Sequence, residues 1–110
     1  MKFGITANPH IPSAMECTKR LLSRLEAKHE VLLESDLARA FDRKGMPLAH
    51  MKPDVMLAIG GDGTILRALQ LSDAKVLGIN SGSLGFLAEV NADDMEGALD
   101  RVARGDYRLD

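Results

Sequence analysis

The stretch that decides the fold is Val55-Met56-Leu57-Ala58-Ile59-Gly60-Gly61-Asp62-Gly63-Thr64. Its short apolar run predicts a buried central strand of a parallel sheet. The glycines that follow predict a tight turn, with a helix opening at Thr64. Glycine allows backbone angles that are closed to other residues and lets a ligand approach the main chain. A helix that begins here directs its free N–H groups and its positive dipole end at an anion such as phosphate.

Asp62 stands inside this turn, although like charges repel and a carboxylate is a poor direct ligand for phosphate. Its position suits a carboxylate that meets a hydroxyl or a metal ion while neighbouring amides hold phosphates, which is the layout of a phosphoryl-transfer site. A turn that needs glycine for geometry alone is the alternative. Two adjacent glycines, an aspartate, a third glycine and a threonine favour the ligand site.

The composition narrows the functional class. The chain has 110 residues, a length typical of one domain, and 45% apolar and 27% charged residues, as in ordinary globular proteins. A net charge of −2 and 4% aromatic residues offer no basic surface or stacking platform for nucleic acid. A single cysteine fits a reducing compartment. Neither a signal peptide nor a membrane-spanning stretch is evident. We therefore expect a cytoplasmic protein without nucleic-acid or membrane partners.

Strands and helices alternate along the chain. Apolar runs predict strands over residues 2–7, 30–34, 55–59 and 75–79. Helices are expected to begin at Ser13, in a capping box with Glu16, and at a cap on Ser35 or Asp36. A last helix is expected from about residue 95, with Gly105 as its stop. This alternation predicts a doubly wound parallel α/β sheet with right-handed crossovers.

Residues 42–53 break the pattern, since Gly45, Pro47 and Pro53 interrupt them. We expect mostly a connection with a short extended piece, either mobile or involved in binding. Cys17 falls on the apolar side of the first helix and is expected to be a small core residue. The three histidines, His10, His29 and His50, share no ligand spacing with one another or with Cys17, so no zinc site is predicted.

A second glycine-containing loop, Asn80-Ser81-Gly82-Ser83-Leu84-Gly85-Phe86-Leu87, follows the strand at 75–79. Carboxyl ends of parallel strands share one edge, where open α/β sheets bind ligands, so the two loops are expected to wall one crevice. Phe86 either stacks on a purine or nicotinamide face or fills the core, the commoner role of a lone phenylalanine. Arg67 is either a solvated helix charge or a phosphate contact.

Neither the Gly-x-Gly-x-x-Gly dinucleotide fingerprint nor the lysine-containing P-loop is present, so another phosphate cradle is needed. Residues 60–68, Gly-Gly-Asp-Gly-Thr-Ile-Leu-Arg-Ala, resemble the first signature of the NAD kinases. The second signature, Asn-x-Gly-x-Leu-Gly-Phe-Leu, matches residues 80–87. The first motif alone is shared with diacylglycerol and sphingoid kinases and, more loosely, with 6-phosphofructokinases. The second motif is therefore what points to NAD kinase.

The resemblance implies transfer of phosphate to the adenosine ribose 2′-hydroxyl of NAD, giving NADP. ATP or inorganic polyphosphate would be the donor, with Mg²⁺ or another divalent metal. Asp62 would be the general base or hydroxyl-orienting group. Phosphate contacts would come from the backbone of the turn glycines, from Thr64 as the helix cap, and from Arg67. The remaining site residues implied are Gly60, Gly61 and Gly63 in the turn, Phe86 in the NAD pocket, and Asn80 and Ser83 near the crevice.

The resemblance also implies a domain division. Residues 1–105 would form the N-terminal α/β domain of the NAD kinase, diacylglycerol kinase and phosphofructokinase type. Residues 106–110 would begin the link to a C-terminal all-β domain that these residues do not contain. We expect the fragment to be inactive alone and the parent protein to be a homo-oligomer, a dimer or tetramer. The alternatives are the catalytic domain of a lipid kinase and a non-catalytic nucleotide-binding module.

Overall fold

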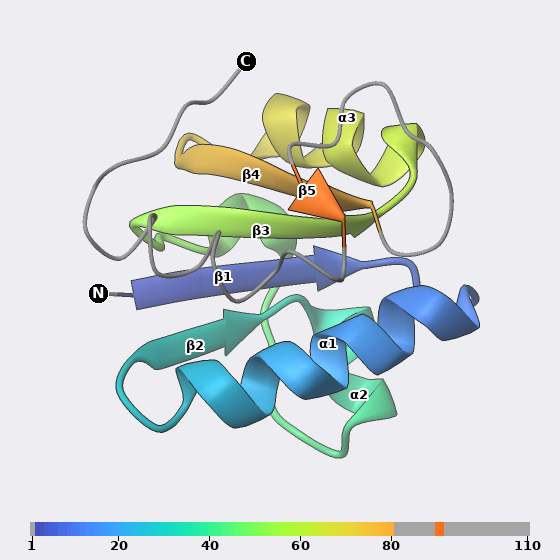
Figure 1. The fold of residues 1–110 in the computed structure, drawn as a ribbon. Helices are drawn as coiled ribbons and strands as arrows, with labels where there is room; N and C mark the ends of the chain where they lie inside the picture. Colours follow the sequence, from blue (N-terminus) through green and yellow to red (C-terminus); the bar gives the residue numbers. More distant parts are fainter. Residues whose placement is uncertain (1, 81–89, 92–110) are drawn as a thin grey trace.

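The computed structural model of the chain describes residues 2–80, 90 and 91. Its strands form one parallel sheet in the order β2-β1-β3-β4-β5, and the arrows of β1, β2 and β3 in Figure 1 point the same way. The strands are β1 (Lys2–Ala7), β2 (Glu30–Leu33), β3 (Val55–Gly60), β4 (Lys75–Asn80) and β5 (Val90–Asn91). The four predicted strands are confirmed, and β5 was not predicted.

Helices cover both faces of the sheet, so the doubly wound fold is confirmed. The helical elements are α1 (Pro12–Leu25), α2 (Ser35–Ala40), the 3₁₀ turn η1 (Leu48–His50) and α3 (Asp62–Leu71). In Figure 1, α1 lies at the front, below β1 and beside β2, whereas α3 lies behind β4. The strand order grows outward in both directions from β1 and β3, so the topological switch point lies between these two strands.

β3 is the central strand that the apolar run predicts, and all six of its residues are buried. Its side chains alternate between two hydrophobic clusters. Val55, Leu57 and Ile59 pack in the cluster that contains the buried side of α1. Met56 and Ala58 pack in the cluster that contains η1 and α3. A strand that is covered on both faces reads as a continuous apolar run, which explains the sequence signal.

The first two helices do not begin as predicted. α1 begins at Pro12 with Ile11 as its N-cap, so the capping box at Ser13 is wrong. The chain turns earlier because Asn8 accepts twice, at its carbonyl from the Ile11 N–H (3.1 Å) and at its side chain from the His10 N–H (2.9 Å). Proline tolerates the first helical position because no donor is needed there. α2 is preceded by Glu34 as its N-cap, so the predicted cap at Ser35 or Asp36 is also wrong.

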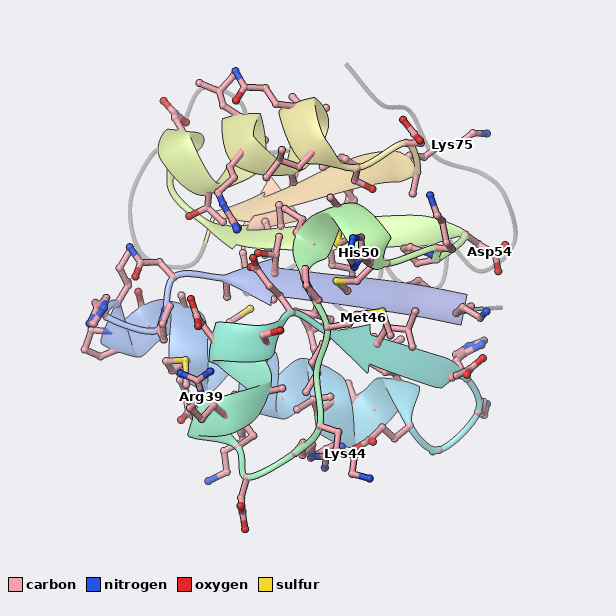
Figure 2. All side chains as sticks on the ribbon, turned by 180° about the vertical axis from the view of Figure 1, so that it is seen from behind. Arg39, Lys44, Met46, His50, Asp54 and Lys75 are labelled. Carbon is pink, nitrogen blue, oxygen red and sulfur yellow. The ribbon has the colours of Figure 1, made fainter. Side chains whose placement is uncertain are left out.

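The connection at residues 42–53 packs against the sheet. Met46 forms a parallel bridge with Glu34, the short extended piece that was expected. Leu48 and Met51 are each 2% exposed, and Figure 2 shows the labelled His50 on the turn that carries them over β1 and β3. A Cβ on Gly4 would lie 2.9 Å from Pro53 Cγ, so glycine in β1 is what lets this segment lie close. The segment therefore completes the core.

The cysteine prediction is confirmed. Cys17 is 2% exposed and belongs to the cluster beneath α1. Burial raises the pKa of its thiol, against a smaller lowering by Arg20, so the thiol is a poor nucleophile. The helix predicted from residue 95 and the strand-like stretch at 106–110 lie outside the described residues.

Candidate functional site

A cleft of about 470 Å³ opens at the carboxyl edge of the sheet. Its walls are the ends of β1 and β2, the turn after β1 and the first turns of α3. This volume is within the range of small-molecule sites, about 300–1,000 Å³. The cleft lies at the switch point between β1 and β3, which is where open α/β sheets bind their ligands.

The turn between β3 and α3 forms one wall of this cleft. Gly60 has a φ of +145°, a conformation that L side chains rarely adopt, so glycine is required there. α3 begins at Asp62, two residues earlier than predicted, because the Gly61 carbonyl already accepts from the Ile65 N–H (3.3 Å). Thr64 is consequently the third helical residue and not the cap, which is Gly61.

The other two glycines of the turn are not required by the fold. A Cβ on Gly61 or Gly63 would meet no atom within 4 Å, and neither has a positive φ. Both residues line the cleft. Backbone conformation therefore explains Gly60 alone, whereas Gly61 and Gly63 leave open space at the N-terminus of a helix. Such space allows a ligand to reach the backbone amides, which favours the ligand-site reading of the motif.

Asp62 is exposed at the first position of α3, where a negative charge is favourable. Residues four and seven positions on, Leu66 and Leu69, share its side of the helix. Thr64 and Arg67 lie on another side, which faces the cleft. Asp62 itself does not line the cleft, although its neighbours Gly61 and Gly63 do.

Arg67 reaches from α3 to the end of β2, where it forms a two-pronged ion pair with Glu34. Its Nη1 donates to Glu34 Oε1 (3.0 Å) and its Nη2 donates to Glu34 Oε2. The hydroxyl of Thr6, in β1, donates to Glu34 Oε1 (2.5 Å). The strand alternation explains the meeting, since Leu33 and Ile5 face α1 and their neighbours Glu34 and Thr6 therefore face α3.

The electrostatics of this group follow from its burial and pairing. Burial raises the pKa of the Glu34 carboxyl, but the hydrogen bonds from Arg67 and Thr6 and the charge of Arg67 outweigh it. The pKa of Glu34 therefore lies below its ordinary value, and the carboxylate is ionised at neutral pH. The hydrogen bond with Glu34 raises the pKa of Arg67, which stays charged.

Glu34 and Thr6 were not predicted as site residues. One signal could have found Glu34, because it is a charged residue directly after the apolar run of a strand, at the edge where ligands bind. Thr6 gave no such signal, since a threonine in a β-strand is ordinary. Its role depends on which residues face it, which the sequence of β1 alone does not specify.

The residues of the second loop are only partly placed. Asn80 ends β4 and pairs in register with Gly60, so the backbones of the two strand ends are neighbours. Ser83 and Phe86 lie outside the described residues, and their predicted contribution to a shared crevice stays a prediction.

The histidines occupy three separate places. His10 and His50 are exposed, whereas His29 packs its ring edge to face with Phe3, at 5.2 Å between centroids. Within residues 2–80, 90 and 91, no group of three or more His, Cys, Asp or Glu residues could hold a metal ion. Over the same residues, no helix is long and apolar enough to cross a membrane.

Comparisons with known proteins identify the family of the chain. The chain is 33% identical over 109 residues to an NAD kinase of Picrophilus torridus, which covers 99% of the chain and 40% of the relative. It is 40% identical over 117 residues to an NAD kinase of Chlorobium limicola, with 99% and 40% covered. The chain thus spans about two fifths of the length of these relatives.

Two solved structures share the fold. A yeast NADH kinase complexed with NADH superposes with a TM-score of 0.81 at 21% identity, over 96% of the chain and 38% of that structure. An NAD kinase from Archaeoglobus fulgidus in complex with ATP gives 0.55 at 26% identity, with the same coverage. The sequence model of the ATP-NAD kinase N-terminal domain matches residues 3–107. The chain therefore belongs to the ATP-NAD kinase family, in the part that corresponds to its N-terminal domain.

Proposed function

We propose that the protein containing this domain phosphorylates the adenosine ribose 2′-hydroxyl of NAD, with ATP as donor, and releases NADP and ADP. The observation that carries the proposal is the turn after β3, where Gly61 and Gly63 leave open space at the start of α3 beside an exposed Asp62. The names of the curated relatives and the ATP in the A. fulgidus structure support it.

In the proposed mechanism, Asp62 accepts the proton of the 2′-hydroxyl as the hydroxyl oxygen attacks the γ-phosphorus of ATP. The bond between that phosphorus and the β,γ-bridging oxygen breaks, and ADP leaves with the bond electrons. Backbone amides of residues 61–64, the N-terminal dipole of α3 and the side chains of Thr64 and Arg67 stabilise the phosphate charge. Gly60 shapes the turn that presents them. Asn80, Ser83 and Phe86 are proposed to complete the NAD side of the crevice.

The position of Asp62 outside the lining of the cleft suits a reaction with two substrates. A donor whose phosphates occupy the cleft beside Thr64 and Arg67 would extend its terminal phosphate past the start of α3. An acceptor would approach from the opposite side of the helix, where Asp62 is exposed. The phosphate would then pass between the substrates at the helix N-terminus, where the dipole favours negative charge.

A divalent metal such as Mg²⁺ is part of the proposal. Mg²⁺ is usually held by one or two carboxylates together with substrate phosphates. The described residues include no group of three or more His, Cys, Asp or Glu that could hold the ion, so substrate phosphates would supply most of its ligands. When bound, the ion would neutralise phosphate charge. Inorganic polyphosphate is proposed as an alternative donor.

Other properties are proposed with the activity. Residues 1–105 are taken as the domain and 106–110 as the start of the link to an all-β domain, which would supply the rest of the site. The parent protein is proposed to be a homo-oligomer, a dimer or tetramer. A cytoplasmic location fits the lone buried cysteine.

The test uses the complete protein that the gene encodes. We expect NADP to form from NAD, ATP and Mg²⁺, with equimolar ADP. Parallel assays offer diacylglycerol or a sphingoid base as acceptor, and calorimetry measures ATP binding alone. Phosphorylated lipid without NADP would replace the proposal by a lipid kinase, and ATP binding without transfer to any acceptor would replace it by a nucleotide-binding module.

A further inference from the structure

The chain of contacts from Thr6 through Glu34 to Arg67 joins β1, the end of β2 and α3. Its two charged ends differ in exposure. The Glu34 side chain is 10% exposed, whereas that of Arg67 is 49% exposed. All three residues line the cleft. The carboxylate is therefore the buried support of the pair, and the guanidinium is the part that solvent or a ligand can reach.

The ion pair leaves part of the guanidinium available. Arginine has five N–H donors in a planar fork, and the contacts with the two Glu34 oxygens use one on each terminal nitrogen. Three donors remain, and a guanidinium can bind phosphate oxygens in the same two-pronged way. A fixed arginine also loses less rotamer freedom when a ligand binds than one that samples solvent.

We propose that Glu34 is a positioning residue, which holds the Arg67 guanidinium at the wall of the cleft with its remaining N–H groups directed to a phosphate of the nucleotide donor. Thr6 supports the same carboxylate from β1. The inference rests on the proposed function in taking the ligand of the cleft to be ATP.

Two other roles for Glu34 are possible on chemical grounds, and the geometry weighs against both. If Glu34 competed with phosphate for Arg67, phosphate binding would displace the Glu34 carboxylate from the guanidinium. That carboxylate is 10% exposed and would then keep only the Thr6 hydroxyl as a partner. A buried unpaired charge is strongly unfavourable. A brace between β2 and α3 would not need a guanidinium that is half exposed in a cleft.

The test compares Glu34→Gln with Glu26→Gln in the complete protein. Glu26 is the matched control because it also pairs with an arginine, Arg43, but does not line the cleft. Calorimetry measures ATP binding without NAD, kinetics measure kcat and the KM for ATP, and melting reports folding. We expect Glu34→Gln to weaken ATP binding and raise the KM for ATP by about tenfold or more, since misplaced contacts are costly. Glu26→Gln should leave both values unchanged.

Further variants separate the possible roles. Thr6→Val should shift ATP binding in the same direction by less, and it decides the matter if Glu34→Gln does not fold. In an Arg67→Ala background, Glu34→Gln should not weaken ATP binding any further, because Glu34 acts on ATP through Arg67. An additive loss would mean that Glu34 contacts ATP itself, and would overturn the inference.

Three other results would also overturn it. If Glu34→Gln lowered the melting temperature but left ATP binding unchanged, Glu34 would be only a structural brace. Tighter ATP binding would identify Glu34 as a competitor. No ATP binding by the unmodified protein would remove the ligand on which the inference rests. If the unmodified protein binds ATP but makes no NADP, the proposed function fails while the calorimetric comparison still tests Glu34.

Discussion

The amino edge and the carboxyl edge of the sheet each carry an arginine–glutamate ion pair, but the two pairs differ in burial. At the edge where the strands begin, the Lys2 backbone N–H donates to the exposed Asp54 (2.7 Å), and Figure 2 shows Asp54 and Lys75 at the starts of β3 and β4. Glu26, near that edge, pairs with Arg43 while both remain about 40% exposed. At the carboxyl edge the same pair of residue types, Arg67 and Glu34, has its carboxylate buried.

Burial changes what such a pair means. An exposed ion pair contributes little stability, typically about 0–1 kcal/mol. A buried pair is not a good source of stability either, because desolvation offsets the attraction and an apolar replacement is often as stable. Glu34 is therefore better explained by what it holds than by the stability it supplies. The difference between the two edges is consistent with the proposal that ligand chemistry takes place at the carboxyl edge.

The largest effect is expected when one carboxylate at each edge of the sheet is replaced by an amide. Asp62→Asn should lower kcat for NADP formation by about 10²–10⁴-fold, the usual contribution of a general base. Asp54→Asn at the opposite edge should leave kcat unchanged. Steady-state kinetics and melting curves of the complete protein measure both. Near-normal turnover by Asp62→Asn, in a folded protein, would remove Asp62 from the proposed mechanism.

The next largest effect concerns the two arginines. Arg67→Ala leaves a buried carboxylate with only Thr6 as partner, so we expect a loss of about 3 kcal/mol in the free energy of unfolding. Arg43→Ala breaks a pair that is exposed on both sides and should lose less than about 1 kcal/mol. Denaturant unfolding compares the two.

A second substitution checks the cause of that loss. In the Arg67→Ala background, Glu34→Gln removes the unpaired charge and should restore part of the stability, since neutral groups are less costly to bury. Equal losses for Arg67→Ala and Arg43→Ala would mean that the Glu34 carboxylate reaches solvent, and the contrast between the edges would disappear.

The sequence predicted the features that depend on local pattern. The buried run before Gly60 specified the central strand, and the motif from Gly60 to Thr64 specified the glycine turn that lines the cleft, whose ligand stays a prediction. Helix starts were less predictable. The turn at Asn8 and the extended backbone of Glu34 set them, and both depend on how the chain leaves a paired strand. A capping pattern cannot report this.

The pairing of Glu34 could not be predicted because its partners are remote. Thr6 is 28 positions away and Arg67 is 33 positions away, and they meet only because β1 lies between β2 and β3 in the sheet. Two interpretations of Arg67 were open in the sequence, a solvated charge or a phosphate contact. The structure adds an ion pair with Glu34, which the sequence did not indicate, and the phosphate contact stays a prediction.

The pH dependence of the unfolding free energy should report the ionisation of the buried Glu34 carboxylate. The pKa of Glu34 lies below its ordinary value of 4.5, so the unfolded chain binds this proton more readily than the native state does. The stability that Glu34 contributes is complete above about pH 4.5 and is lost as the pH falls from there through the pKa of the folded state. Unfolding free energies measured between pH 7 and pH 3 should thus fall less steeply in Glu34→Gln. Identical slopes would contradict the pairing.

The smallest expected effect comes from Gly63→Ala, which distinguishes a glycine needed for ligand binding from one needed for folding. Gly63 lies in the first turn of α3 with open space around it, so Gly63→Ala should be tolerated by the fold and even raise stability by about 0.5 kcal/mol. The added methyl group would instead narrow the cleft where a phosphate approaches the amides, and ATP binding should weaken. Gly4→Ala is the matched control, because a Cβ there would press on Pro53 and two methionines, and it should destabilise the protein.

The two glycine variants should therefore differ in both measurements. Gly63→Ala keeps the melting temperature and loses ATP affinity, whereas Gly4→Ala loses stability and, while folded, keeps its ATP affinity. If Gly63→Ala bound ATP as well as the unmodified protein, no phosphate would approach that part of the backbone. The open turn would then be a feature of the strand-to-helix geometry alone. The main evidence that phosphate transfer takes place at the carboxyl edge would be removed.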